Sequence, residues 1–411
     1  MVEGSSKPYS FFTWPLEPLN PWTLEEVVQE IMSKKNGILK PALRMIAWEL
    51  TRSCNLNCLH CRAAAEQGPY AGELTTEECF RFIDEVAAFS KPVLILTGGE
   101  PLLREDIFEI ASYGTHKGLR VVMAVNGTLL NAEKARAAKQ AGIQRVSISL
   151  DGAVAEAHDR FRGVTGAFTG AMEGISYLKE AGLAFQINTT VTKRNLGEIE
   201  DILQLAIEKG AAAHHIFLLV PTGRGRELAH EGVTPEEYEQ TLTWFAEQDS
   251  KAPIQLKATC APQYHRIIHQ QGNTKDRKGQ VDGLHTFTRG CLGGISFCFV
   301  SHQGDTQPCG YLEVSGGNIR ERSFQEIWEK AEVFQRLRDV NNLKGKCGRC
   351  EYRHVCGGCR ARAYALHGDY LAEEPLCPYQ PRGQLPSRKR DGLRVQGFKR
   401  SRGRVIKPMN S

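Results

Sequence analysis

The sequence lacks the features of exported and membrane-spanning proteins. No apolar run approaches the roughly 20 residues that a transmembrane helix needs, and residues 1–10 do not have the basic-then-apolar order of a signal peptide. We therefore expect a cytoplasmic protein without a membrane partner. Hydrophobic residues make up 41% of the chain and charged residues 24%, which excludes a disordered or collagen-like chain. For 411 residues, we expect two or three domains with separate hydrophobic cores.

Acidic residues are scarce only at the C-terminal end. Residues 381–411 contain ten Lys or Arg and one acid, Asp391, so this segment accounts for more than the whole net charge of +5. The preceding 380 residues are slightly acidic, with a net charge of −4. We expect the basic segment to be a disordered, solvated tail, and we do not expect nucleic acid as a partner.

The thirteen cysteines are, in contrast, numerous. Thiols stay reduced in the cytosol, so this number predicts metal or redox chemistry rather than a disulfide framework. Three form one tight group, eight lie in the last third of the chain, and two stand alone. The isolated Cys79 falls within a helical pattern, where we expect it in the core. The isolated Cys260 ends a strand-like run, and it is either a buried apolar thiol or a substrate-facing hydrogen donor or iron ligand.

Strand-like and helical patterns alternate along the chain from residue 45. Strand-like runs are followed by amphipathic segments without the turn signals of antiparallel hairpins, which predicts an α/β protein with a parallel sheet covered by helices. A six-unit partial barrel and an open doubly wound sheet both fit this order, and both place ligands at the carboxyl ends of the strands. The strand-like runs are 45–50, 92–96, 120–125, 145–150, 184–191 and 215–220, and the helical runs are 75–89, 104–117, 132–141, 167–181 and 196–209.

Composition divides the chain into five segments. Residues 1–43 form an extension with a short helical pattern at 23–32, and residues 44–260 hold the βα units with a further strand-like run at 253–259. The polar residues 261–290 are predicted to be a linker. Residues 291–380 are rich in Gly and Cys, with one helix at 324–338, and are too irregular for a large apolar core, so we expect metal to hold them together. The basic tail is 381–411.

Cys54, Cys58 and Cys61 follow the first predicted strand directly. Three thiolates at this spacing can converge on one metal centre and leave one coordination position open, where a cofactor can bind. A structural zinc site needs a fourth protein ligand. His60 is a candidate for that ligand, although its place between Cys58 and Cys61 makes a shared tetrahedron awkward.

This triplet, after the first of a series of βα units, resembles the radical S-adenosylmethionine (radical SAM) superfamily over roughly residues 44–230. The resemblance implies a partial (β/α)6 barrel of the TIM type. It also implies that the three cysteines hold a [4Fe-4S] cluster whose fourth iron is chelated by the methionine part of SAM. In this family, reductive cleavage of SAM gives a 5′-deoxyadenosyl radical that takes hydrogen from unactivated carbon, and the protein binds and orients the reactants.

Further motifs of the family follow in chain order. Gly98, Gly99, Glu100 and Pro101 stand after the second predicted strand, and the resemblance implies that this turn binds the SAM amino group, with Glu100 as acceptor. Other strand-end residues match family contacts to the ribose, carboxylate and adenine of SAM, although polar residues at strand ends are also typical of turns. These residues are Asn126, Ser149, Asp151, Asn188 and, through its backbone, Val220.

The last eight cysteines follow the pattern C-x6-C-x5-G-x4-C, then C-x2-C-x5-C-x2-C and a final Cys. The two C-x2-C pairs taken alone are also typical of a zinc ribbon. After the triplet, the pattern resembles the SPASM extension of radical SAM enzymes, which implies two auxiliary [4Fe-4S] clusters. By that resemblance the cluster nearer to SAM is held by Cys291, Cys298, Cys309 and Cys359, and the farther one by Cys347, Cys350, Cys356 and Cys377.

The last x2 spacing departs from the commoner x3 of this extension. The sharing of the cysteines between clusters therefore stays open, and a single auxiliary cluster with spare thiols is an alternative. Full cysteine ligation leaves no open iron, so such clusters would carry electrons rather than bind substrate. An electron-accepting cluster favours a net oxidation of the substrate.

Four phrases, at residues 46–53, 61–65, 214–226 and 356–364, look like the radical SAM enzymes that complete the siroheme-dependent heme pathway. The resemblance implies an iron porphyrin substrate, Fe-coproporphyrin III, whose two propionates are oxidatively decarboxylated to vinyl groups, giving protoheme. It also implies an electron donor such as ferredoxin or flavodoxin, and we expect a monomer. The arginines would bind propionates, and the alternative for each is an exposed charge in a loop. The histidines would bind the porphyrin iron, and the alternative for each is a structural role. The candidates are Arg160, Arg162, Arg224, Arg226, His214 and His215.

Other functions stay open at this point. The enzyme alternatives are a radical SAM enzyme that acts on another tetrapyrrole, such as a siroheme-derived intermediate or a heme d1 precursor, and a SPASM enzyme that matures a peptide. An alternative of a different class is a zinc-stabilised interaction protein that uses its basic tail. That protein would contain zinc and would not cleave SAM.

Overall fold

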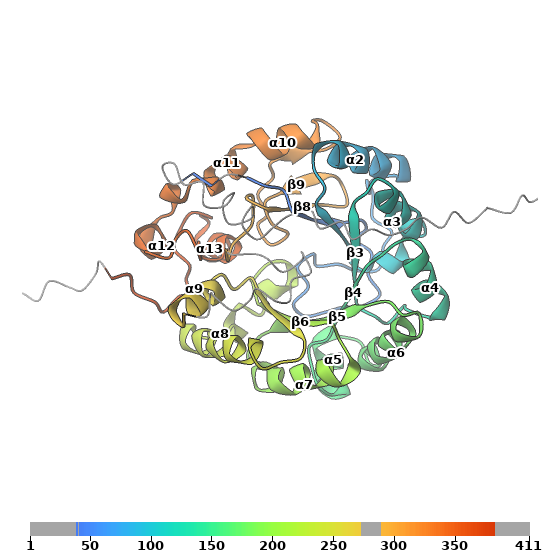
Figure 1. The fold of residues 1–411 in the computed structure, drawn as a ribbon, viewed down its shortest axis with the longest axis horizontal. Coiled ribbons are helices and arrows are strands. Elements are labelled where there is room, and N and C mark those ends of the chain that lie inside the picture. The colour runs from blue at the N-terminus through green and yellow to red at the C-terminus, as the bar shows by residue number, and fades with distance from the viewer. Residues whose placement is uncertain (1–37, 40, 273–288, 383–411) are drawn as a thin grey trace, which may run out of the picture.

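The computed structural model describes residues 38–39, 41–272 and 289–382 (Figure 1). Within these ranges, a ten-stranded sheet has the strand order β10-β9-β8-β1-β2-β3-β4-β5-β6-β7. The helical pattern at 23–32 and all but two residues of the predicted basic tail lie outside the described residues. The strands are β1 (Met45–Glu49), β2 (Val93–Thr97), β3 (Arg120–Val125), β4 (Val146–Ser149), β5 (Phe185–Val191), β6 (Ala213–Leu218), β7 (Gln255–Thr259), β8 (Phe297–Val300), β9 (Asp305–Gln307) and β10 (Gly317–Asn318).

Strands β1 to β7 are parallel and follow one another in chain order across the sheet. The order has no reversal, so the predicted α/β fold is confirmed as a partial barrel, and the doubly wound alternative is not formed. The sheet extends beyond six strands at both edges. At one edge β7 pairs with β6. At the other edge β8, from the C-terminal part of the chain, pairs in parallel with β1, and β9 and β10 follow in antiparallel pairs.

The helices that follow the strands form an outer ring around them (Figure 1). Local signals explain where several of them begin and end. Helix α2 begins after Thr75, because the side chains of Thr75 and Glu78 each accept a hydrogen bond from the other's backbone amide in a capping box. Helix α7 ends at Gly210, which has the left-handed conformation with φ +80°. The helices of the barrel are α2 (Thr76–Phe89), α3 (Ile107–His116), α4 (Ala132–Gln140), α5 (Ala155–Arg162), α6 (Ala167–Glu180), α7 (Ile199–Lys209), α8 (Pro235–Asp249) and α9 (Gln263–Gln270).

Short 3₁₀ turns join these elements, and helix α9 lies in the segment that was predicted to be a linker. In the parts of the chain that the structure describes, we find no helix with the length and apolar character needed to cross a bilayer. The 3₁₀ turns are η1 (Pro101–Leu103), η2 (Leu196–Glu198), η3 (Gly223–Arg226) and η4 (Ala229–Glu231), with η6 (Val340–Asn342) in the C-terminal part.

Alternation along each strand separates the hydrophobic core from the interior of the barrel. In β3, Val121 and Met123 are fully buried under the helices, whereas Val122 and Ala124 face the interior. The main core therefore lies between the sheet and the helical ring. Cys79 of α2 is fully buried in this core, as predicted.

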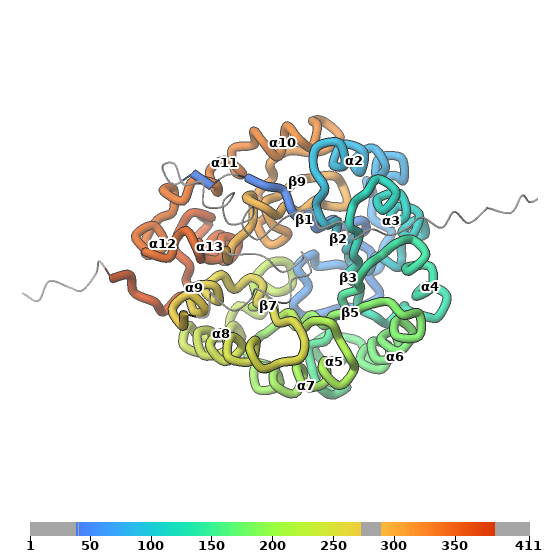
Figure 2. The backbone as a smooth tube through the Cα atoms, in the orientation of Figure 1, coloured from blue at the N-terminus to red at the C-terminus, as the bar shows by residue number. Residues whose placement is uncertain are grey.

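The C-terminal helices continue the ring between α9 and α2 (Figure 2). Helix α10 packs on α2, where the rings of Phe324 and Phe82 meet edge to face with centroids 5.4 Å apart. The single helix predicted at 324–338 is instead two helices, because Ala331 has an extended backbone with φ −64° and ψ 132°. The helices of this part are α10 (Phe324–Lys330), α11 (Glu332–Arg338), α12 (Gly345–Arg349) and α13 (Arg360–His367).

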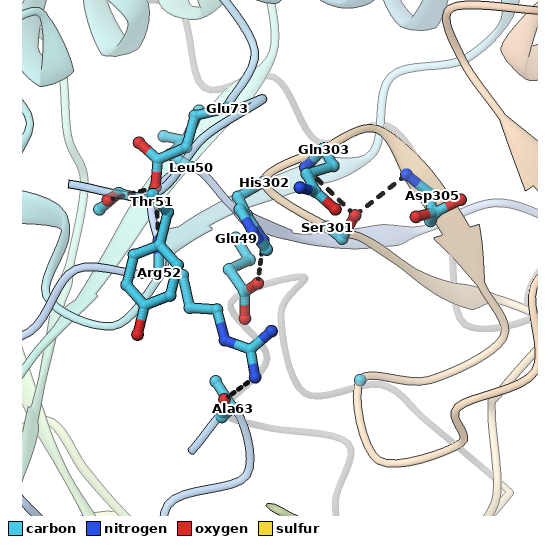
Figure 3. A network of polar contacts seen from close by, with 12 residues as sticks. Glu49, Leu50, Thr51, Arg52, Ala63, Glu73, Ser301, His302, Gln303 and Asp305 are labelled. Carbon is cyan, nitrogen blue, oxygen red and sulfur yellow. Dashed lines mark hydrogen bonds and ion pairs between the residues drawn. The ribbon is translucent and has the colours of Figure 1, made fainter. Parts of the chain in front are cut away.

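A buried ion pair joins the barrel to the C-terminal part. Glu49, the last residue of β1, contacts Arg62 at 2.5 Å. It also contacts His302, in the turn between β8 and β9, at 2.8 Å (Figure 3). Burial would raise the pKa of Glu49, but the Arg62 charge and the His302 hydrogen bond outweigh it and lower that pKa to about 2. The carboxylate is therefore charged at neutral pH and holds the two parts together at the end of the barrel.

Candidate active site

The interior of the barrel is a cavity of about 480 Å³. Its walls are inward-facing strand residues, such as Ala47 in β1, Ser147 in β4 and Phe217 in β6. The C-terminal part contributes Phe297 and Phe299 of β8. This volume lies in the range that is typical of small-molecule sites.

Residues 54–61, which we call the cysteine loop, follow β1 and bring three thiols to the cavity wall. The end of α5 holds the loop on one side, because the Leu59 amide donates to the Phe161 carbonyl at 3.1 Å. Arg224 of η3 holds it on another side. Its amide donates to the Cys61 carbonyl at 3.0 Å, and its Nε donates to the Cys58 carbonyl at 2.9 Å. Two elements that are distant in sequence, α5 and η3, therefore fix the shape of the loop.

The three thiols of the cysteine loop suit an iron–sulfur cluster. Burial raises the pKa of Cys54 to about 11 and also raises the pKa of Cys58, so the protein alone leaves both thiols protonated at neutral pH. Bound iron would supply the positive charge that deprotonates them. Backbone amides already point at the sulfurs, because Leu56 donates to Cys54 Sγ at 3.5 Å and Ala65 donates to Cys61 Sγ at 3.3 Å. Hydrogen bonds of this kind tune cluster potentials.

The turn at residues 98–101 packs against the segment just before the cysteine loop. The Gly99 amide donates to the Thr51 carbonyl at 2.8 Å, and both Gly98 and Gly99 line the cavity. A Cβ on Gly98 would lie 2.5 Å from the Thr51 carbonyl oxygen, and a Cβ on Gly99 would lie 2.3 Å from that of Ser53. Only glycine lets the two backbones approach this closely.

Glu100 is fully buried and lies behind the cavity wall. Its carboxylate accepts from the amides of Leu102 at 3.1 Å and Asn126 at 2.7 Å, and burial raises its pKa to about 7. Pro101 is also buried, at the first position of η1. Glu100 therefore connects the turn to the end of β3. A direct contact between Glu100 and the amino group of SAM stays a prediction.

Gly99→Ala is expected to disable this site. The added methyl group would force the turn away from Arg52 and Ser53, just before the cysteine loop, so we expect a loss of about 2–3 kcal/mol in the free energy of unfolding together with loss of SAM binding. Urea unfolding and equilibrium dialysis measure the two effects. Gly197→Ala is the matched control, because a Cβ at Gly197 meets no atom within 4 Å. Equal behaviour of the two variants would contradict the packing argument.

Three of the polar strand-end residues line the cavity together. Asn126 follows β3, and its Nδ2 donates to Oδ1 of Asn55 in the cysteine loop at 2.8 Å. Ser149 and Asn188 face the same cavity from β4 and β5. The carboxyl ends of β3, β4 and β5 therefore present a polar wall beside the three thiols.

Asp151 and Val220 do not line this cavity, although the resemblance implies that they contact SAM. Asp151 is fully buried, and its carboxylate contacts Arg162 at 2.5 Å and accepts from the Thr190 amide. Arg162 does line the cavity, with Nη1 3.6 Å from Cys58 Sγ. Asp151 therefore positions a positive charge beside the cysteine loop. Val220 is buried, and its carbonyl accepts a hydrogen bond within its own loop.

Only two of the six candidate substrate residues, Arg162 and His215, line the cavity. His214 precedes His215 in β6, but it is fully buried on the other face, where it contacts Thr189 Oγ1 at 2.9 Å and packs against Phe245. Because side chains alternate across a strand, neighbouring histidines cannot both face the cavity. His214 is therefore a structural residue.

Arg160, Arg224 and Arg226 lie outside the cavity and have other contacts. Arg160 is exposed on α5 and contacts Glu156, one turn earlier, at 2.5 Å. Arg224 holds the cysteine loop. Arg226 is exposed and contacts Glu313 of the C-terminal part at 2.5 Å. We therefore do not retain these three arginines as substrate residues.

The C-terminal cysteines gather in two places. Four of them line a second, smaller cavity of about 30 Å³, and they are the four predicted for the farther cluster, Cys347, Cys350, Cys356 and Cys377. Three others, which we call the nearer cysteines, line the central cavity, and they are Cys291, Cys309 and Cys359. Across residues 38–39, 41–272 and 289–382, no three His, Cys, Asp or Glu side chains converge on one metal-ion position. A cubane, by contrast, binds its thiolates to different iron atoms.

Cys298 does not join the nearer cysteines. It stands in β8 between Phe297 and Phe299, which line the cavity, so its side chain points to the opposite face of the sheet. There it is fully buried in the hydrophobic core, as is Ile46, its register partner in β1. The set of four cysteines predicted for the nearer cluster therefore has only three members at the cavity.

Several cavity residues were missed in the sequence. Six cationic side chains line the central cavity, and among the described residues that line it none is Asp or Glu. Arg162 was already a candidate, and Arg145 alternates with Ser147 and Ser149 in the sequence, so the strand pattern carried a signal for it. Arg62 follows the cysteine loop and Lys257 lies in β7, whereas Arg289 and Arg360 lie near Cys291 and Cys359 in the sequence. The six are Arg62, Arg145, Arg162, Lys257, Arg289 and Arg360.

Comparison with known proteins gives two family matches. Residues 48–206 match the radical SAM superfamily, and residues 291–359 match SPASM, an iron-sulfur cluster-binding domain. The AdoMet-dependent heme synthase of Methanosarcina barkeri is 59% identical over 83% of this chain and 97% of its own. That of Oleidesulfovibrio alaskensis is 53% identical over 83% and 89%. The Fe-coproporphyrin III synthase of Methanosarcina barkeri is 34% identical over 81% and 87%.

Two solved structures share the fold. Streptococcus suis SuiB bound to S-adenosylmethionine superposes with a TM-score of 0.67 at 14% identity, over 83% of this chain and 78% of that one. Native anSMEcpe with bound AdoMet superposes with a TM-score of 0.61 at 19% identity, over 82% and 94%. At these identities the structures support the fold alone.

Proposed function

The chain belongs to the radical SAM superfamily, in the SPASM-containing group that includes the AdoMet-dependent heme synthases, and from this premise we propose that it converts Fe-coproporphyrin III into protoheme. Membership implies a SAM-binding [4Fe-4S] cluster and auxiliary iron–sulfur clusters as cofactors. In the proposed reaction two propionate side chains are oxidatively decarboxylated to vinyl groups.

The charge of the central cavity is the observation that carries this choice of substrate. Six Arg or Lys line it together with apolar residues, and none of the described lining residues is acidic. Arg62 and Arg162 contact buried carboxylates behind the wall, whereas the guanidinium groups of Arg289 and Arg360 donate to backbone carbonyls. Such a site favours an apolar ligand that carries several anionic groups. An iron porphyrin with four propionates has this chemistry.

The residues of the cavity divide into two groups under this proposal. The cysteine loop would hold the SAM-binding cluster, and Gly98, Gly99, Asn126, Ser149 and Asn188 would bind and orient SAM. When bound, the cluster and SAM supply the radical that takes a hydrogen atom from a propionate β-carbon. The cationic residues would hold the propionates, so that one β-carbon at a time faces SAM.

The balance of the reaction calls for an electron acceptor. After the β-carbon loses a hydrogen atom, the bond between the α-carbon and the carboxylate breaks and carbon dioxide leaves. The vinyl double bond then forms between the α- and β-carbons, and one electron is released. Each vinyl group therefore consumes one SAM. An auxiliary cluster held by the nearer cysteines would border the same cavity, so it could take up the electron without solvent exposure of the substrate.

The experiment that tests the function is an anaerobic assay. Purified protein is incubated with dithionite, SAM and Fe-coproporphyrin III, and the porphyrins and 5′-deoxyadenosine are separated by chromatography. We expect protoheme, with a porphyrin carrying one vinyl group as the intermediate. Turnover of another tetrapyrrole or of a peptide, without protoheme from Fe-coproporphyrin III, would overturn the proposed substrate.

Lys257→Met is expected to weaken binding of Fe-coproporphyrin III by about tenfold to a hundredfold, the cost of one hydrogen bond to a charged group. Lys257 lines the cavity from β7, and burial lowers its pKa to about 8. Titration of the porphyrin Soret band measures the dissociation constant. Lys251→Met is the matched control, because Lys251 is exposed after α8. Equal affinities in the two variants would remove Lys257 from the substrate site.

A further inference from the structure

Of the four cysteines predicted to hold the auxiliary cluster nearer to SAM, only three lie at the central cavity. The nearer cysteines bring three thiols to the central cavity, and Cys298 lies on the opposite face of β8. Cys260, directly after β7, lines that same cavity. We infer that Cys260 joins the nearer cysteines as the fourth ligand of this auxiliary cluster, in place of Cys298.

Packing brings Cys260 close to the nearer cysteines. The side chains of Cys260, Cys291, Cys309 and Cys359 all line the central cavity. A Cβ on Gly290, one residue before Cys291, would lie 2.6 Å from Cα of Pro262, two residues after Cys260. The segments that carry Cys260 and Cys291 therefore pack directly against each other.

The backbone of Cys260 is held in an unusual conformation. Its φ is +56°, a value that L residues rarely adopt. The Cys260 carbonyl accepts from Arg362 Nη2 at 2.9 Å and from the Tyr238 hydroxyl at 3.3 Å. Strain of this kind persists where the surroundings enforce it, and it is concentrated at functional sites.

Arg362 also connects Cys260 to one of the nearer cysteines. Its guanidinium contacts Glu374 at 3.2 Å, and Glu374 Oε2 accepts from the Cys359 amide at 2.7 Å. The side chains of Arg362 and Glu374 are 1% and 0% exposed. A buried network therefore fixes the backbone of Cys260 relative to that of Cys359, although the two residues are 99 positions apart in the sequence. Cluster ligands need this kind of rigid mutual placement.

The test compares Cys260→Ser with Cys298→Ser in the full-length protein purified and reconstituted without oxygen. Iron content, sulfide content and the EPR spectrum of the dithionite-reduced protein are measured, and circular dichroism checks the fold. For Cys260→Ser we expect either loss of about four iron atoms, which is one cubane, or full iron with a changed auxiliary EPR signal, because one iron exchanges a thiolate for oxygen. For Cys298→Ser we expect the iron content and spectrum of the unsubstituted protein.

Cys260→Ala and Cys298→Ala repeat the comparison without a hydroxyl group, in case a buried serine unfolds β8. The inference would be overturned if neither Cys260 variant changed the iron content or the EPR spectrum. It would also be overturned if Cys298→Ala lost the EPR signal of the auxiliary cluster. Formation of 5′-deoxyadenosine from SAM alone reports on the cysteine loop in every variant. None of these measurements uses a porphyrin, so they separate failure of the ligand assignment from failure of the proposed substrate.

Discussion

Replacement of Cys58 by alanine is expected to lower the dithionite-dependent formation of 5′-deoxyadenosine by at least about 10³-fold, an effect on the scale of removing a principal catalytic group. Cys58 is buried at the cavity wall, with Arg162 3.6 Å from its sulfur and Arg224 bound to its carbonyl. The thiols of Cys54 and Cys61 cannot move to take its place as a cluster ligand, because hydrogen bonds from α5 and η3 fix the backbone of the cysteine loop. Anaerobic incubation with SAM and chromatography of the nucleoside product measure the loss.

Cys79→Ala is the control for this experiment. Cys79 is buried, as is Cys58, but it lies on the core face of α2 and not at either cavity. Its loss removes one sulfur from a packed core, so we expect a cost of about 1 kcal/mol in stability and SAM cleavage at the level of the unsubstituted protein. Equal loss of 5′-deoxyadenosine in both variants would contradict the assignment of the cysteine loop.

Arg362→Met is expected to destabilise the protein by about 3–5 kcal/mol, because it leaves the buried Glu374 carboxylate without its partner. Arg362 and Glu374 are 3.2 Å apart with almost no exposed area. The same guanidinium donates to the carbonyls of Leu218, the last residue of β6, and of Leu219, and to that of Cys260 after β7. Its loss should therefore loosen the C-terminal part from the barrel, and auxiliary iron should be released earlier than the rest.

Urea unfolding followed by circular dichroism, with a chromogenic iron chelator present, measures both effects of Arg362→Met. Arg322→Met is the matched control. Arg322 and Glu326 also form an ion pair at 3.3 Å, but their side chains are 37% and 42% exposed, and such pairs contribute at most about 1 kcal/mol. Similar midpoints for the two variants would contradict the role given to the buried network.

Much of the fold was predictable because local patterns specify most of its elements. The run at 120–125 has the bounds of β3, and the capping pattern at Thr75 marks the start of α2. The break at Ala331 between α10 and α11, where the backbone is extended, was not predicted. The pairing of β8 with β1 was also not predictable, because it joins segments about 250 residues apart.

The candidate site was predictable to a smaller extent. Residue types were identified at the correct strand ends, but the direction of each side chain was not. His214 and His215 point to opposite faces of β6, and Arg160 and Arg162, on one helix, lie at the surface and at the cavity. A shift of one residue along a strand reverses the face, so a list of strand-end residues necessarily mixes cavity residues with core residues.

Without coordinates, cysteine spacing and the βα pattern predicted a parallel sheet and the cysteine loop, and the resemblance to the radical SAM superfamily implied the barrel and the four cysteines that line the smaller cavity. The signals behind these predictions are mostly local, since the C-x2-C spacings and the alternation along a strand involve residues a few positions apart. The fold decided which side chains share the central cavity. It excluded Cys298, brought Cys260 to the nearer cysteines and collected six cationic residues from distant segments. Those relations depend on strand register and long-range packing, which no short stretch of sequence contains.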